Sequence, residues 1–244
     1  MPEPAEALPA VEIERETVSR WEDYIDVFFS PSELFARRAR DRVAPPLLTL
    51  LLLAFVFYFV LLPANGMIMR ASVGDNPQTI EAMNRYGTVM QVVGSIAVPM
   101  TYLVVLASGA ALLWLVGRFA DIRTDFSRTM LVVTYAGFVY LLAQIAGGIS
   151  VILHGGVDLD IVRDMSFGVL RFVGDSDMNQ ALVALLRRFE IFALWQAVLW
   201  AIGIRVIYDV SGTRAGVVAC VTWALLAVPG LIMGAFGLGG PPQS

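Results

Sequence analysis

The chain contains no lysine, one histidine and one cysteine, and each shortage excludes a kind of chemistry. All 17 basic residues are arginines, so a Schiff base, which needs a lysine amine, cannot form. Cys220 has no second cysteine with which to form an internal disulfide. His154 and Cys220 lie in distant parts of the sequence, unlike the closely spaced ligands of zinc sites. We therefore expect no metal and no cofactor.

The sequence also lacks the patterns that carry common catalytic chemistry. It has no GxSxG, no HExxH and no phosphate-binding loop. The net charge is −4, and much of it comes from acidic residues in the first 33 positions, whereas nucleic-acid-binding domains are usually basic. These absences predict a protein that is not an enzyme and has no nucleic-acid partner.

What the sequence does contain is long apolar runs. Hydrophobic residues make up 57% of the chain and the mean hydropathy is +0.71. A bilayer span needs roughly 20 predominantly apolar residues, and five stretches reach that length: Pro45–Pro63, Gln91–Val116, Met130–Leu153, Phe189–Tyr208 and Ala215–Phe236. The runs are apolar on every face rather than alternating, so they predict helices rather than barrel strands. The expected fold is an all-α integral membrane protein built on a five-helix transmembrane bundle.

The region before the first run divides into two parts. Residues 1–16, rich in Pro, Ala and Glu, are expected to be disordered, and they do not resemble a cleavable signal peptide. Residues 17–44 predict a short amphipathic segment of two helices. Ser30 is placed as the N-cap of the second helix, with Pro31 in its first turn and Glu33 reaching back to the cap. The residues after the last run, 237–244, form a tail.

The distribution of arginines predicts the orientation. With the N-terminus in the cytoplasm, eleven arginines lie on the inner side and six on the outer side, which agrees with the positive-inside rule. The outer loop 154–188 alternates acidic and apolar residues. It predicts a short surface helix near Ile161–Val173 and a second helix that is capped by Asp177 and runs into the fourth span. The loop would lie on the headgroups or act as a ligand-binding lid.

Two sets of residues are candidates for function. Polar side chains within the spans either hydrogen-bond between helices or line a pathway, and the main ones are Gln91, Tyr135, Gln144 and Gln196. The amphipathic segment presents a candidate surface for a protein partner or for anionic lipid, made of Phe28, Phe29, Pro31, Phe35, Arg37, Arg38, Arg40 and Arg42.

Small residues and prolines indicate how the helices pack. Ala193, Ala197 and Ala201 recur four apart, as do Ala143 with Gly147 and Gly230 with Gly234. Such spacing permits close helix approach, within one chain or in a homo-oligomer. Pro99 and Pro229 are expected to kink their helices.

The whole pattern resembles the Yip family, membrane proteins that interact with Ypt/Rab GTPases, in the branch found in bacteria. The resemblance rests on Phe28-Phe29-Ser30-Pro31 with Phe35, on Arg188-Phe189-Glu190-Ile191-Phe192-Ala193-Leu194-Trp195-Gln196, and on Gly203-Ile204-Arg205. It covers roughly residues 20–236. The Asp-Leu-Tyr-Gly-Pro and Gly-Tyr-x-x-x-Pro motifs of eukaryotic members are absent, so Rab binding is not carried over.

The resemblance implies a multi-pass protein of the bacterial cytoplasmic membrane that acts as a scaffold or adaptor. It would recruit a protein partner or organise the bilayer itself. A small transporter, channel or lipid scramblase using the span glutamines is the alternative, although five spans do not divide into an inverted repeat.

Overall fold

The computed structural model describes residues 20–73, 77–155, 166–173, 180–186 and 188–235. The disordered tail expected over residues 1–16 and the tail 237–244 lie outside these ranges, as does Asp177. Helices dominate the described residues and no strand is formed there, which confirms the all-α prediction. The helices are α1 Arg20–Phe29, α2 Pro31–Arg38, α3 Ala44–Val60, α4 Leu62–Val73, α5 Pro77–Phe119, α6 Phe126–His154, α8 Leu170–Val173, α9 Gln180–Leu186, α10 Ile191–Tyr208, α11 Gly212–Leu225 and α12 Val228–Ala235.

Four helices within the described ranges are long and apolar enough to cross a bilayer. They are Gln91–Phe119, Phe126–His154, Ile191–Tyr208 and Gly212–Ile232. A fifth candidate is α3 with Leu62–Ala71 of α4, which are apolar enough when taken together but meet at a 70° bend between Val60 and Leu62. The expected first span, Pro45–Pro63, runs past this bend.

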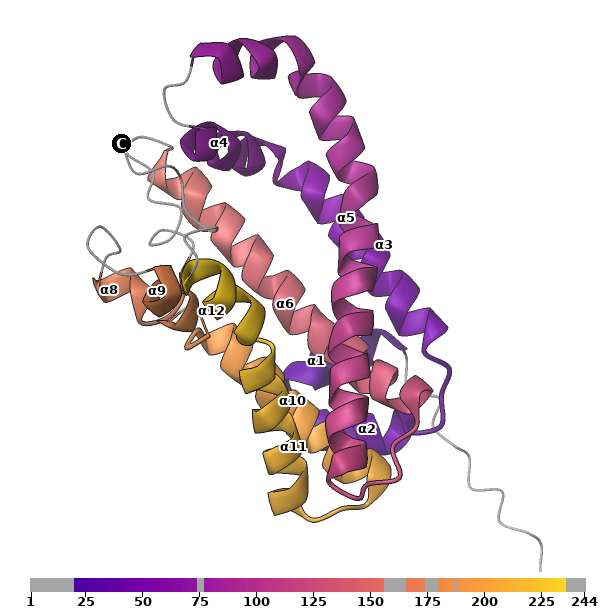
Figure 1. Cartoon of the computed structure of the whole chain (residues 1–244). Coiled ribbons are helices and arrows are strands. Elements are labelled where there is room, and N and C mark those ends of the chain that lie inside the picture. Colours follow the sequence, from indigo (N-terminus) through magenta and orange to yellow (C-terminus); the bar gives the residue numbers. More distant parts are fainter. Residues whose placement is uncertain (1–19, 74–76, 156–165, 174–179, 187, 236–244) are drawn as a thin grey trace, which may run out of the picture.

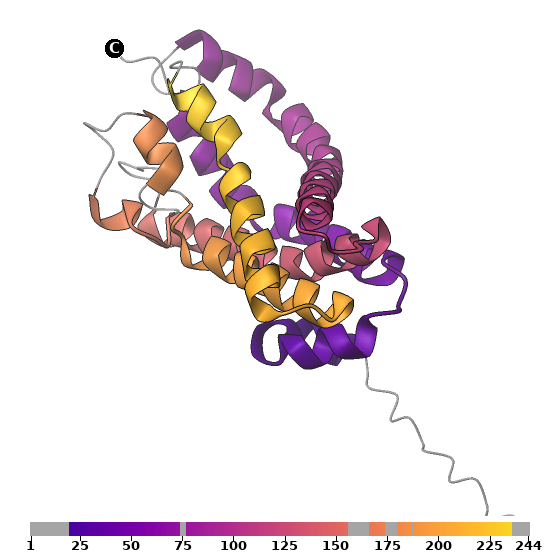
Figure 2. The ribbon, with the colours of Figure 1, turned by 60° about the horizontal axis from the view of Figure 1, so that its bottom comes forward.

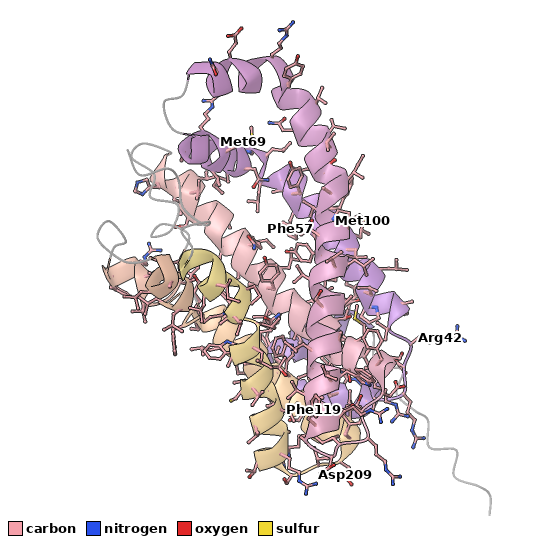
Figure 3. All side chains as sticks on the ribbon, viewed as in Figure 1. Arg42, Phe57, Met69, Met100, Phe119 and Asp209 are labelled. Carbon is pink, nitrogen blue, oxygen red and sulfur yellow. The ribbon has the colours of Figure 1, made fainter. Side chains whose placement is uncertain are left out.

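The helices place several short connections at one end of the bundle. The α1–α2 hairpin, the α5–α6 turn and the α10–α11 turn lie at this end in both views (Figures 1 and 2). Figure 3 labels Phe119 and Asp209 here and Met69 at the opposite end. We call it the arginine-rich end, because the connections and the helix turns next to them contribute Arg37, Arg38, Arg40, Arg42, Arg123 and Arg205.

Helix α6 forms the centre of the bundle, and glycines let its neighbours approach. Its residues from Thr129 to Val139 are all buried. A Cβ at Gly203 of α10 would lie 2.5 Å from Val132 Cγ1, and one at Gly137 of α6 would lie 2.7 Å from Leu50 Cδ2. These two close contacts with α6 are made at glycines outside the four-residue repeats that the sequence indicated.

Regions expected as loops contain further helices. Residues 64–90 separate the first two expected spans, and α4 and the start of α5 occupy much of this stretch. Helix α9 ends at Leu186, so it does not run on into α10.

The two prolines within the expected spans have different effects on their helices. Helix α5 continues through Pro99, whereas α11 and α12 are separate helices and the break between them lies just before Pro229. At that break the Arg188 Nη2 donates to the Leu226 carbonyl.

A hydrogen-bonded tyrosine joins α10 to α6 at the arginine-rich end. The Tyr208 hydroxyl lies 2.9 Å from Thr129 Oγ1 and donates to the Asp125 carbonyl at 2.8 Å, and it accepts from the Asp125 amide at 3.1 Å. We expect Tyr208→Phe to lower the free energy of unfolding by about 1–2 kcal/mol, because Thr129 and the Asp125 backbone then lose the hydroxyl to which they are hydrogen-bonded. Denaturation in detergent micelles measures the change.

The control for this prediction is Tyr140→Phe. Tyr140 is partly exposed and its ring packs beside that of Tyr102, so removing its hydroxyl should change stability by less than about 0.5 kcal/mol. Equal stabilities for the two variants would contradict the assigned role of Tyr208.

Candidate functional site: a charged helical hairpin docked on the bundle

Helices α1 and α2 form a tight hairpin before the first span. Ser30 occupies the N-cap position of α2 and Pro31 its first turn, as expected. The Ser30 side chain makes no capping hydrogen bond, and Glu33 does not complete a capping box. The reason is that the Ser30 amide already donates to the Asp26 carbonyl at 2.8 Å. The two helices are therefore joined by a continuing backbone bond rather than by side-chain caps.

Asp23 is the buried centre of the hairpin, with only 2% of its surface exposed. Its carboxylate accepts from Arg37 Nη2 and from Arg38 Nε, each at 2.9 Å. The Tyr135 hydroxyl of α6 also donates to it, at 3.4 Å. A buried carboxylate is stable only when it is paired and hydrogen-bonded, and here the partners come from α2 and from the bundle.

The two arginines extend this cluster toward the surface. Arg37 also donates to Asp26, and Arg38 to Asp41 at 3.2 Å. The hydrogen bond to Asp26 raises the pKa of Arg37 above its usual value, although partial burial opposes it. Burial lowers the pKa of Arg38, but the charge and hydrogen bond of Asp23 outweigh it and leave the pKa raised. Both guanidinium groups therefore stay charged.

Aromatic contacts hold the hairpin against the spans. The Tyr24 ring packs on Phe138 at 4.8 Å between centroids, and its hydroxyl donates to Thr49 Oγ1 at 3.0 Å. Phe35 is fully buried and meets the Tyr135 ring edge-on at 6.2 Å. Because Thr49 lies in the second turn of α3 and Phe138 well inside α6, the hairpin packs beside the spanning helices rather than hanging beyond their ends.

The opposite face of α1 carries an exposed apolar stripe. Trp21, Ile25 and Phe29 are 73%, 60% and 82% exposed. Their spacing of four residues places them on one side of the helix. Helix α1 thus buries Asp23 and Val27 against the bundle and turns three large apolar side chains outward.

The candidate surface predicted from the sequence is divided by the fold. Pro31 and Phe35 are buried, Phe28 is half-buried, and Arg37 and Arg38 are held in ion pairs, which leaves Phe29, Arg40 and Arg42 exposed. Among the polar residues of the spans, Tyr135 joins the Asp23 cluster. Gln91 is exposed, and its backbone carbonyl accepts from Tyr58; Gln144 and Gln196 are half-buried. No hydrogen bond links any two of these four described side chains.

The central residue of this site was not singled out from the sequence. In the sequence, Asp23 is only one of several acidic residues in an acidic segment. A usable signal is its spacing, because Asp23 lies four residues before the apolar Val27 and so shares its helix face. An acid on an apolar face followed by an arginine pair in the next helix indicates an internal ion pair.

The fold and the apolar spans define a multi-pass, all-α integral membrane protein that contacts the lipid bilayer. No curated protein and no solved structure matches it significantly. The Yip1 domain family matches residues 25–233, which is most of the chain, from α1 to α12. The chain belongs to the Yip1 domain family, as its resemblance to the Yip proteins indicated.

Proposed function

We propose that this protein is a non-enzymatic scaffold of the cytoplasmic membrane, with its arginine-rich end on the cytoplasmic side. In this function α1 lies in the inner leaflet and the bundle holds it at a fixed depth. The observation that carries the proposal is the stripe of Trp21, Ile25 and Phe29, exposed on a helix whose other face is anchored by Asp23.

The surroundings of the stripe favour lipid as its occupant. Tyr24 bonds to the second turn of α3, so α1 lies close to the level at which the first span begins. Tryptophan and phenylalanine are common on helices that lie in the membrane interface. Exposed Arg40 and Arg42 follow on the same segment, and arginines next to a span attract anionic headgroups.

A fixed apolar helix in one leaflet supports a role in organising the membrane. An interfacial helix occupies area between headgroups, and its binding depends on curvature and lipid composition. Here the hairpin is held to the bundle, because Tyr24 contacts α3 and α6, and Tyr135 of α6 packs on Phe35 and donates to Asp23.

The proposal is tested by measuring the depth of α1 in proteoliposomes. A fluorescent label is placed at Ile25→Cys, and for comparison at Arg123→Cys in the exposed α5–α6 turn, both in a Cys220→Ser background. We expect the label at position 25 to emit at shorter wavelength and to be quenched by nitroxide-bearing lipids, and the label at 123 to report water. Equal, water-like signals at both positions would refute insertion of the stripe.

A second measurement addresses the scaffold role itself. Vesicles containing the wild-type protein are compared by electron microscopy with vesicles containing the triple variant Trp21→Ser, Ile25→Ser, Phe29→Ser. If the stripe organises the bilayer, the wild type changes vesicle size or shape and the variant does so less at equal protein density. The same morphology in both samples would leave no membrane-organising role for α1.

A further inference from the structure

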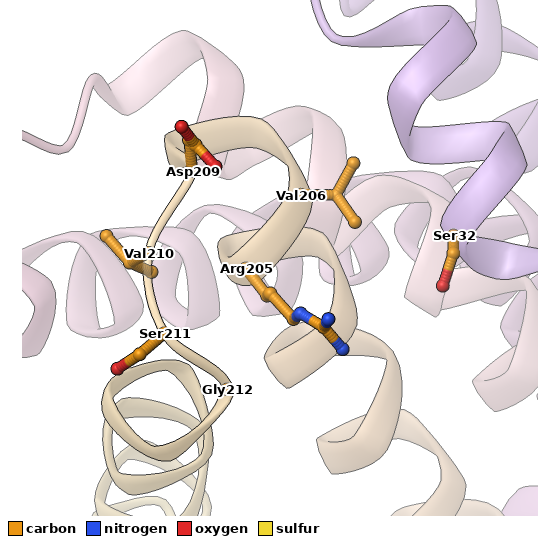
Figure 4. A pocket seen from close by; sticks show the side chains of 7 residues that line it. All are labelled: Ser32, Arg205, Val206, Asp209, Val210, Ser211 and Gly212. Carbon is orange, nitrogen blue, oxygen red and sulfur yellow. The ribbon is translucent and has the colours of Figure 1, made fainter.

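A polar hollow lies where the α10–α11 turn meets α2, apart from the Asp23 cluster. Its volume is about 550 Å³, within the range of about 300–1,000 Å³ that is usual for small-molecule sites. The polar side chains that line it are Ser32 of α2, Arg205 and Asp209 at the end of α10, and Ser211 before α11 (Figure 4). Two segments far apart in the sequence therefore supply its walls, namely α2 and the continuous stretch 205–212.

The hollow contains one positive and one negative side chain that do not pair with each other. Residues four apart on a helix normally face the same side, so Arg205 and Asp209 would be expected to form an ion pair. Asp209 is instead the C-cap of α10, with a left-handed backbone at φ 49°. This conformation turns its carboxylate away from the guanidinium, and the two point in different directions in Figure 4. Arg205 makes no ion pair within the described chain.

Ser32 is placed beside these charges by the packing of α2. Pro31 and Leu34 flank it and are buried, and α2 packs against α10. Ser32 itself is exposed, and its hydroxyl can donate to an anionic oxygen. The position of this hydroxyl is thus fixed by the same docked hairpin that the Asp23 cluster holds.

The hollow lies at the level of the lipid headgroups. Helix α10 has 18 residues, so it is ~27 Å long, close to the ~30 Å hydrocarbon thickness of a bilayer. A span of this length places Arg205 and Asp209, in and after its last turn, near one membrane surface. The headgroup of a phospholipid would therefore reach the hollow directly from the bilayer.

The geometry points to a binding site for a phosphate ester that carries a primary ammonium group, which is the chemistry of a phosphoethanolamine headgroup. The phosphate binds the Arg205 guanidinium and the Ser32 hydroxyl, and the ammonium group binds the Asp209 carboxylate. A zwitterion fits because the two charges in the hollow are unpaired, opposite and turned apart. An anionic headgroup would leave Asp209 unsatisfied, and a choline group cannot donate a hydrogen bond to it.

Native mass spectrometry of the full-length protein tests this site with three phospholipids of identical acyl chains. We expect phosphatidylethanolamine to bind more tightly than phosphatidylcholine or phosphatidylglycerol. Arg205→Gln should weaken binding of phosphatidylethanolamine about tenfold or more, since a hydrogen bond to a charged group contributes this much. Asp209→Asn should reduce the preference for phosphatidylethanolamine over phosphatidylglycerol. The control is Arg214→Gln, an exposed arginine of α11 that does not line the hollow, and it should bind like the wild type.

Competition with soluble O-phosphoethanolamine identifies the source of the ligand. Displacement of the lipid at equal concentrations supports a soluble phosphate ester as the occupant, and persistence of the lipid supports a headgroup. The inference is overturned if the wild type binds the three lipids equally. It is also overturned if Arg205→Gln and Asp209→Asn leave binding unchanged, or if Arg214→Gln weakens it as much as Arg205→Gln. None of these results depends on whether the α1 stripe enters the bilayer.

Discussion

Replacing Asp23 by alanine is expected to lower the free energy of unfolding by about 2–4 kcal/mol, because Arg37 and Arg38 then lose a buried partner. Breaking a fully buried pair costs about 3–5 kcal/mol, but the two arginine side chains are 27% and 15% exposed, and solvent offsets part of the loss. The Tyr135 hydroxyl also loses its acceptor. Thermal or denaturant unfolding in detergent measures the effect.

Limited digestion with trypsin gives a second, local measurement for the same variant. The hairpin ends in arginines after which trypsin cleaves, and of these Arg37 and Arg38 are held in ion pairs with Asp23. If Asp23 anchors the hairpin, Asp23→Ala is cut after Arg37 and Arg38 faster than the wild type under conditions in which the bundle stays folded. The matched control is Glu22→Ala, which removes an exposed neighbouring carboxylate. Identical unfolding and digestion of the two variants would show that the cluster does not anchor the hairpin.

Adding a side chain at Gly203 is expected to separate α10 from α6. A Cβ at this position would lie 2.5 Å from Val132 Cγ1 and 2.8 Å from Val132 Cγ2, closer than non-bonded carbon atoms approach. Val132 is fully buried and β-branched, so it has little freedom to rotate away. Gly203→Ala should therefore lower stability by about 1–3 kcal/mol through overpacking, and Gly203→Leu should lower it more.

Gly216→Ala is the matched control for this prediction. Gly216 lies within α11, and a Cβ there meets no atom within 4 Å. Alanine is a better helix former than glycine by roughly 1 kcal/mol, so this variant should be as stable as the wild type or more stable. If Gly203→Ala unfolded at the same denaturant concentration as Gly216→Ala, the close contact between α6 and α10 would not contribute to the free energy of unfolding.

The spans could be predicted from the sequence because their signal is local. Each run is long, apolar and free of central charges, and lipid requires such a run to bond its own backbone as a helix. Pro63, in the first turn of α4, is a local signal for a break in the helix, but the 70° angle of the bend could not be predicted. What accompanies the bend is a contact with a distant helix: Leu61 is buried, and Gly148 of α6 lies against it. The hydropathy of neighbouring residues cannot predict such a contact.

The hairpin illustrates a similar division within the candidate site. Alternation of apolar and polar residues and the Ser30-Pro31 pair predict two short helices and the boundary between them. The pattern also suggests that Phe35 and the arginine pair form a surface. Phe35 is instead buried against Tyr135, and the arginines bind Asp23. Amphipathicity identifies a face that can be covered, but it does not say whether lipid, a partner or the chain's own bundle covers it.

By itself the sequence determined that lipid is the solvent, that the chain is helical and which runs are long and apolar enough to span a bilayer. These properties follow from transfer free energies summed over neighbouring residues, so they need no knowledge of distant contacts. Tertiary structure alone decided which face of α1 stays exposed and that Asp23 meets Arg37, Arg38 and Tyr135. It also decided that Arg205 and Asp209 lie beside Ser32 without an ion pair to any residue that the structure describes. Those relations join residues far apart in the chain or depend on a single left-handed cap, and only packing of the helices against one another fixes them.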